Sequence, residues 1–148
     1  MLLCTGPKFG ENELALMRKC GMGGRIAYAH PTNDAQMAGL YKSAKLFVYT
    51  SEYEGFGIPT LEAYKMKCPV LLNGNNPCFH EVAGDAAVFY DNESQEDTCE
   101  KVEYILDMNE DEMENLIHKQ SNRLSLYSWE KTGRIVANIY KDIYGKQS

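Results

Sequence analysis

Residues 46–72 read LFVYTSEYEGFGIPTLEAYKMKCPVLL, with apolar runs and turn residues in the order strand, helix, strand. Leu46 to Tyr49 is a nearly continuous apolar run, as expected for a strand that is buried on both faces. Residues 58–67 suit a helix with Pro59 in its first turn, where no backbone hydrogen bond is lost. Val70 to Leu72 is a second apolar strand. This order predicts two parallel strands that are joined by a crossover helix.

The same alternation extends to both sides of this segment. Further strands are predicted at 2–5, 25–29 and 86–89, and further helices at 11–20 and from Asn33 to about Lys45. Asn33 and Gln36 have the spacing of a capping box at the start of the latter helix. Apolar strands that alternate with helices predict an α/β fold, namely a Rossmann-like parallel sheet flanked by helices.

Beyond residue 90 the pattern is helical only, which predicts a helical C-terminus. Ser94 with Asp97, and later Ser128, are placed to cap two helices, and Met113 to Leu124 marks another helix between them. The last helix carries Trp129 and an apolar stripe at helical spacing. We interpret that stripe as part of the core.

Composition places the chain among globular proteins. It has 148 residues, of which 44% are hydrophobic and 24% are charged. This length predicts one domain over 1–148, large enough to bury a core. No apolar run approaches the roughly 18 residues that a membrane-spanning helix needs. Met1 to Cys4 lacks the length and the basic start of a signal peptide, so we predict a cytoplasmic protein whose five cysteines are reduced thiols.

The formal net charge of −6 is distributed unevenly. Residues 91–114 contain eleven acidic side chains and one basic side chain, whereas the rest of the chain has ten acidic and fourteen basic ones. No dense stripe of lysine and arginine is present, which argues against nucleic acid as a partner. A small anionic ligand is compatible with the mildly cationic remainder of the chain.

The loop from Thr50 to Pro59 follows a predicted parallel strand and leads into a helix, and such loops bind ligands in α/β folds. Gly55 and Gly57 allow the backbone to approach a ligand closely, and the helix start leaves N–H groups unpaired. Together with the positive end of the helix dipole, these groups form a site for phosphate. Pro59 has no N–H. The amides expected to bind phosphate are those of Gly57, Ile58 and Thr60.

Glu54 and Glu62 stand on either side of this turn. Glu54 lies in the loop and Glu62 lies one turn into the helix, so the two carboxylates cannot share a helix face. We interpret them as acceptors for two different parts of one extended ligand, since a carboxylate accepts well from vicinal hydroxyls. An ordinary strand–turn–helix with two solvated glutamates explains the same residues, and the Gly-x-Gly pattern alone does not decide between these interpretations.

The segment EGFGIPTLEA, from Glu54 to Ala63, resembles the E-x7-E motif of the retaining group 1 glycosyltransferases (family 4), which have the GT-B fold. Four further segments resemble motifs of the same family, in the same order along the chain. They are LYKSA at 40–44, CPV at 68–70, EVAGDAA at 81–87 and YSWE at 127–130. The resemblance therefore covers almost the whole chain.

The resemblance implies the donor-binding half of an enzyme that transfers a sugar from a nucleotide-sugar to an acceptor in glycan or polysaccharide biosynthesis. It implies that Glu54 is the catalytic residue, acting as an orienting and electrostatic group near the reacting centre. It assigns Glu62 to the ribose hydroxyls and His30 to the base. The other donor-binding residues that it implies are Gly55, Phe56, Gly57, Ile58 and Thr60.

The donor that the resemblance implies is a UDP-, GDP- or ADP-sugar, and no metal or other cofactor is expected. The family's enzymes have an additional N-terminal domain that binds the acceptor. Their donor domain opens with a strand–helix unit that supplies Arg and Lys to the diphosphate. Neither part has a counterpart in this chain, so we expect weak nucleotide binding and no turnover by the chain alone. We expect no transmembrane segment, and peripheral membrane association of the full enzyme stays open.

Two other interpretations stay open. The chain can be a non-catalytic interaction module, or a subunit of a split transferase, that docks through the apolar side of its last helix. A dehydrogenase-type nucleotide domain is the least favoured, because Leu2 to Pro7 lacks the glycine-rich turn that such a domain needs after its first strand.

Overall fold

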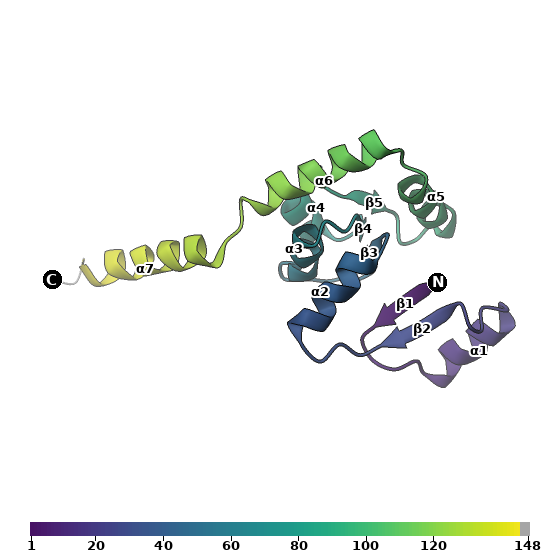
Figure 1. The fold of residues 1–148 in the computed structure, drawn as a ribbon. Coiled ribbons are helices and arrows are strands. Elements are labelled where there is room, and N and C mark those ends of the chain that lie inside the picture. Colours follow the sequence, from purple (N-terminus) through teal and green to yellow (C-terminus); the bar gives the residue numbers. More distant parts are fainter. Residues whose placement is uncertain (146–148) are drawn as a thin grey trace. The chain divides into compact units, whose positions relative to one another are not determined.

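The computed structural model describes residues 1–145 and shows parallel strands flanked by helices (Figure 1). The strands form two parallel sheets, one of two strands and one of three. The chain divides into two compact units, Met1–Gly39 and the part from Leu40 onward, and the division falls within helix α2 (Asp34–Ser43). Each unit has its own sheet.

The first unit is a strand–helix–strand arrangement. Its elements are β1 (Leu2–Thr5), α1 (Glu11–Lys19) and β2 (Ile26–Ala29), followed by the start of α2. The two strands are parallel, and the last residue of β1, Thr5, lies opposite Ala29 at the end of β2. The loops that follow these two strands therefore begin at the same edge of the sheet. His30 opens the second of these loops.

The second unit is built on three parallel strands in the order β3-β4-β5. These strands are β3 (Phe47–Tyr49), β4 (Val70–Asn73) and β5 (Val88–Tyr90). The helices that lie wholly within this unit are α3 (Ile58–Lys65), α4 (Pro77–Ala83), α5 (Gln95–Leu106), α6 (Glu110–Leu124) and α7 (Trp129–Gly145). Helix α3 packs against β4 and α6, and α5 packs against β5.

The central strand of this sheet carries the core of the second unit. All four residues of β4 are buried. Leu71 on β4 packs with Tyr90 on β5 and Ile105 on α5 in one buried cluster. Burying a leucine side chain contributes about 1.5–3 kcal/mol, so the short apolar run at 70–72 stabilises the sheet that positions the loops on either side of it.

Most helices and strands that the sequence predicts are present. The predicted cap of α5 is confirmed, because the Asp97 N–H donates to Ser94 Oγ at 3.1 Å. The capping box at α2 forms only in part. The Gln36 N–H donates to Asn33 Oδ1 at 3.0 Å, but the Gln36 side chain accepts from the Thr32 N–H instead of from Asn33.

Some boundaries and pairings differ from the prediction. One sheet is expected and two are present, because the strand pattern does not reveal which strands pair. The last strand is Val88–Tyr90 instead of 86–89. Helix α4 lies where no helix is predicted. It begins at Pro77, and Asn76 Oδ1 caps it by accepting from the Cys78 N–H at 3.1 Å.

The expectation that the stripe on the last helix belongs to the core is wrong. Helix α7 buries none of its 17 residues, and Trp129 is 82% exposed. Helical spacing of apolar residues shows that a helix has an apolar face, but it does not show what covers that face.

Two further observations concern membrane-spanning helices and the state of the cysteines. Within residues 1–145, no helix is both long enough and apolar enough to cross a membrane. All five cysteines lie in this range and none of them is paired with another. The prediction of a single domain over 1–148 stays a prediction.

Replacing Leu71 by alanine should lower the free energy of unfolding by about 2–5 kcal/mol, because it leaves a cavity at a fully buried position. Leu106→Ala on α5 is the control. Its side chain is 50% exposed, and we expect a change of about 0.5 kcal/mol or less. Urea denaturation followed by circular dichroism measures both values. Similar losses in the two variants would contradict the placement of the core.

Candidate functional site

The turn between β3 and α3, with the first turns of that helix, contains all the predicted site residues except His30. Gly57 is the N-cap of α3 and has a left-handed backbone with φ of +84°, a conformation that favours glycine. Pro59 follows in the first turn of the helix. A Cβ atom at Gly57 would lie 3.1 Å from Cε1 of the buried Phe79 on α4. Backbone conformation and close packing therefore both require glycine at this position.

The amides of this turn are only partly occupied. The Thr60 N–H donates to the Gly57 carbonyl at 3.0 Å, so it belongs to the turn itself. Among the described residues, no backbone hydrogen bond uses the amides of Gly55, Phe56 or Gly57. Ile58 begins α3, where the first amides lack helical partners. These N–H groups, at the positive end of the helix dipole, can donate to an anion.

Thr60 supports the turn from inside the protein. Its side chain is fully buried, and its Oγ1 has no hydrogen-bond partner in the described part of the chain. A Cβ atom at Gly57 would lie 3.7 Å from this oxygen, so the hydroxyl is adjacent to the turn. Of the three amides that the sequence assigns to phosphate, that of Thr60 is thus engaged within the protein. The Thr60 hydroxyl has no partner among the described residues.

Glu54 lies in the loop after β3 and is half-buried. Its Oε1 accepts a hydrogen bond from the hydroxyl of Tyr49, the last residue of β3. Burial raises the pKa of the Tyr49 hydroxyl, and the hydrogen bond to Glu54 and the negative charge of Glu54 raise it further. Tyr49 therefore remains a neutral donor at physiological pH and orients the carboxylate.

Glu62 lies one turn into α3 and is exposed. Its Oε2 accepts from the hydroxyl of Tyr41 on α2 at 3.3 Å. Burial, and then the charge of Glu62, raise the pKa of the Tyr41 hydroxyl, so this group is also a neutral donor. Each carboxylate is thus held by its own tyrosine from a different element. This arrangement suits two carboxylates with separate roles.

The end of β4 and the residues that lead into α4 anchor the loop after β3, which carries Glu54. The side-chain amides of Asn73 and Asn76 donate to the Ser51 carbonyl at 3.3 and 3.5 Å, and both asparagines are buried. The sequence patterns single out neither of these asparagines, and neither Tyr41 nor Tyr49, which hold the two carboxylates. The one available signal was a polar residue, Asn73, directly after the apolar run at 70–72.

His30 belongs to the first unit. Its ring stacks on Tyr28 with the centroids 6.4 Å apart and the planes at 18°, and the Tyr28 hydroxyl lies 3.3 Å from His30 Nδ1. The side chain is exposed, and its neighbour on β2 orients it. The expected contact between His30 and the base stays a prediction.

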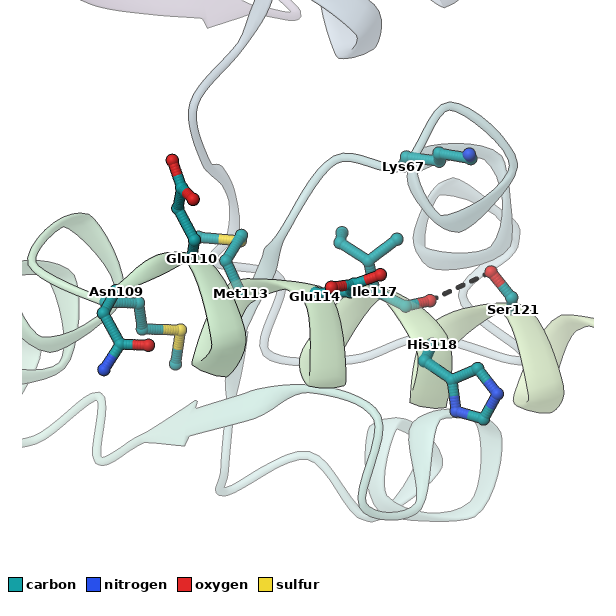
Figure 2. Close-up of a pocket in the computed structure, with 9 residues that line it drawn as sticks. Lys67, Asn109, Glu110, Met113, Glu114, Ile117, His118 and Ser121 are labelled. Atoms are coloured by element: carbon teal, nitrogen blue, oxygen red, sulfur yellow. Dashed lines mark hydrogen bonds between the residues drawn. The ribbon is translucent and has the colours of Figure 1, made fainter.

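An open hollow of about 580 Å³ lies along α6, and none of the predicted site residues lines it. Figure 2 shows that side chains of α6, among them Met113, Ile117 and His118, surround it together with Lys67. Its lining mixes apolar side chains with charged ones. Volume alone does not define a binding site. The chemistry of the described residues therefore favours the turn before α3 over this hollow.

Metal binding gains no support from side-chain clusters. Within residues 1–145, no three or more His, Cys, Asp and Glu side chains are placed to hold a metal ion. The expectation that no metal or other cofactor takes part stays a prediction.

A parallel α/β unit with a glycine turn at a helix start is a recurrent arrangement in nucleotide-binding proteins. The family model of the group 1 glycosyl transferases matches residues 5–123 of this chain. The chain belongs to this family, as the E-x7-E segment indicates.

Individual relatives agree with this assignment. The serotype-specific mannosyltransferase WbdA of Escherichia coli is 28% identical over 112 residues, which cover 76% of this chain and 13% of that protein. The structure of sucrose-phosphate synthase from Thermosynechococcus elongatus matches with a TM-score of 0.83 at 19% identity, covering 98% of this chain and 39% of that one. The structure of Alr3699/HepE of Anabaena, solved with UDP and glucose, matches with a TM-score of 0.78 at 15% identity. The match covers 95% of this chain and 40% of that one.

The structural likenesses confirm the predicted fold, a Rossmann-like arrangement of parallel strands flanked by helices. The chain spans 13% of the curated relative and 39% and 40% of the two solved chains. The activity, substrates and partners of the whole protein are therefore matters of proposal.

Gly57→Ala should lower the free energy of unfolding by at least about 1–2 kcal/mol. Alanine is strained at a φ of +84°, and its Cβ would lie 3.1 Å from the Phe79 ring. Gly55→Ala is the matched control, because a Cβ there meets no atom within 4 Å. We expect a change of about 0.5 kcal/mol or less for the control. Equal values in urea denaturation would contradict the description of this turn.

Proposed function

We propose that this chain is the donor-binding part of a retaining glycosyltransferase that transfers a sugar from a UDP-, GDP- or ADP-sugar in glycan biosynthesis. The observation that carries the proposal is the turn at Gly57, where unpaired amides at a helix start lie between two separately held carboxylates. Membership of the group 1 family supports sugar transfer. The HepE structure with UDP and glucose supports a nucleotide-sugar as the ligand.

The start of α3 holds the diphosphate in this proposal. The free amides of Gly55, Phe56 and Gly57, with that of Ile58, stabilise the negative charge that develops on the departing phosphate oxygen as its bond to the sugar breaks. Glu62, further along the helix, accepts hydrogen bonds from the ribose hydroxyls. Tyr41 keeps its carboxylate in place.

Glu54 acts at the sugar in this proposal. Its carboxylate, oriented by Tyr49, stabilises the positive charge that develops on the anomeric carbon in an oxocarbenium-like transition state. The acceptor hydroxyl oxygen then forms the new bond to that carbon, and the hydroxyl proton passes to the departing phosphate oxygen. Retention of configuration is part of the proposal, and its support is the resemblance to the E-x7-E motif.

Mannose is the sugar that the relatives favour, because the Escherichia coli protein that matches this chain is a mannosyltransferase. An acceptor-binding domain and a further strand–helix unit are needed to complete the enzyme in this proposal. Their support is that the chain covers only 39% and 40% of the two solved relatives. The chain alone should therefore bind nucleotide weakly without turnover. A cytoplasmic location, with or without peripheral attachment to a membrane, stays part of this proposal.

Helix α7 favours a second role, as an interaction module or as a subunit of a split transferase. Trp129, Ile139 and Ile143 on this helix are all more than half exposed. Exposed apolar faces of this kind mark interaction surfaces. Co-purification with a separately encoded acceptor-binding half would support this role, and a chain that ignores such a half would contradict it.

Glu62→Ala should weaken binding of the best ligand among GDP, UDP and ADP by about 1–3 kcal/mol, because a hydrogen bond to a charged acceptor is lost. Isothermal titration calorimetry measures this loss, and Glu52→Ala, at an exposed position in the loop before α3, is the control that should bind normally. Glu54→Ala should act mainly on the transfer rate of the complete enzyme. Negligible effects of both changes, on donor affinity and on rate, would refute the assigned roles.

A further inference from the structure

The side chain of Phe56 in the candidate site contacts Tyr127, which lies far away in the sequence. Its ring meets that of Tyr127 edge-on, with the centroids 5.5 Å apart and the planes at 82°. This is a favourable geometry for an aromatic pair. Tyr127 lies in the short connection between α6 and α7. The contact therefore joins the site turn to the end of α6.

Tyr127 is itself fixed from two sides. The Arg123 guanidinium lies over its ring at 5.7 Å from the centroid, within the range of a cation–π interaction. The Tyr127 hydroxyl donates to the carbonyls of Val82 and Glu81, at 3.3 and 3.4 Å, near the end of α4.

Arg123 binds the same two carbonyls. Its Nε donates to the Val82 carbonyl at 2.8 Å, and its Nη2 donates to that of Glu81. A cation at this end of a helix is stabilised by the dipole. Arg123 and Tyr127 therefore form a rigid block on α4, and α4 also carries the Phe79 ring that packs on Gly57.

The turn needs such a support because glycines flank Phe56. Gly55 has open space around the position of a Cβ atom, and glycine restricts the backbone less than any other residue. Phe56 is the one residue among these three with a side chain, so its ring gives the surrounding structure a second hold on the amides, beside the packing of Gly57 against Phe79. We infer that Tyr127 is a positioning residue, which fixes the Gly55–Gly57 amides through the Phe56 ring.

This inference rests on the proposed function for its consequence, since well-placed amides matter only if they bind a ligand. Preorganised donors bind better because ordering them costs nothing at the moment of binding. Loss of the ring pair should therefore raise the Kd of a nucleotide without unfolding the chain. The strength of an aromatic pair corresponds to a change of about two- to tenfold.

The test compares Tyr127→Ala with Tyr127→Phe, which keeps the ring and loses the hydroxyl, and with Tyr104→Ala at a tyrosine on α5 that is 54% exposed. ¹⁵N relaxation gives the order parameters of the Phe56 and Gly57 amides without ligand, and calorimetry gives the Kd for GDP, UDP and ADP. In Tyr127→Ala we expect order parameters that fall from about 0.85 to below about 0.6, and a Kd that rises about two- to tenfold. Tyr127→Phe keeps the Phe56 pair and the Arg123 contact with the ring, so it should lie much closer to the wild type than Tyr127→Ala does. Tyr104→Ala should match the wild type.

Unchanged order parameters and unchanged Kd in a folded Tyr127→Ala variant would overturn the inference. Phe56→Ala removes the same ring pair by truncating the other ring, that of Phe56, a residue that is 42% exposed. This variant tests the inference if Tyr127→Ala does not fold. It should loosen the Gly57 amide in the same way, and a rigid amide there would also overturn the inference. Absence of nucleotide binding by the wild type would refute the proposed function, whereas the order parameters would still decide the role of Tyr127.

Discussion

The left-handed backbone of Gly57, packed against the Phe79 ring, is the constraint on which the rest of the site depends. This residue ends the loop after β3 and starts α3, so it sets the direction of that helix and with it the place of Glu62. Phe79 belongs to α4, and the loop before α4 holds Ser51 through two buried asparagines. The site turn therefore has its shape only when the β4–α4 segment is folded against it.

The electrostatics of the second unit agree with a ligand that has several polar parts. Donor amides lie at the start of α3, with a carboxylate before them and another after them. Both carboxylates are held by tyrosines whose pKa values are raised, chiefly by burial, so the partners stay neutral. A neutral donor orients a carboxylate without cancelling its charge. In the proposed function, Glu54 serves the developing positive centre and Glu62 serves the ligand hydroxyls.

Local features of this fold were predictable from the sequence, and long-range contacts were not. The apolar strands, the Ser94 cap and the glycine turn before α3 depend on neighbouring residues, so their patterns are visible in the chain. The tyrosine at position 41 meets Glu62 across 21 residues, and Tyr127 meets Phe56 across 71, so no local pattern shows either contact. The apolar stripe of α7 predicts a core position that the structure does not confirm, because a periodic pattern shows an apolar face but not what covers it.

Titration of the ¹⁵N-labelled chain with GDP, UDP and ADP, followed by amide chemical shifts in NMR, tests most directly whether the start of α3 binds a nucleotide diphosphate. Binding at the start of α3 predicts the largest shifts at residues 55–58 and at Glu62, for at least one nucleotide. It predicts no more than small shifts around Met113 and His118 in the hollow along α6. Shifts confined to that hollow, or no shift between Gly55 and Glu62 with any of the three nucleotides, would contradict it.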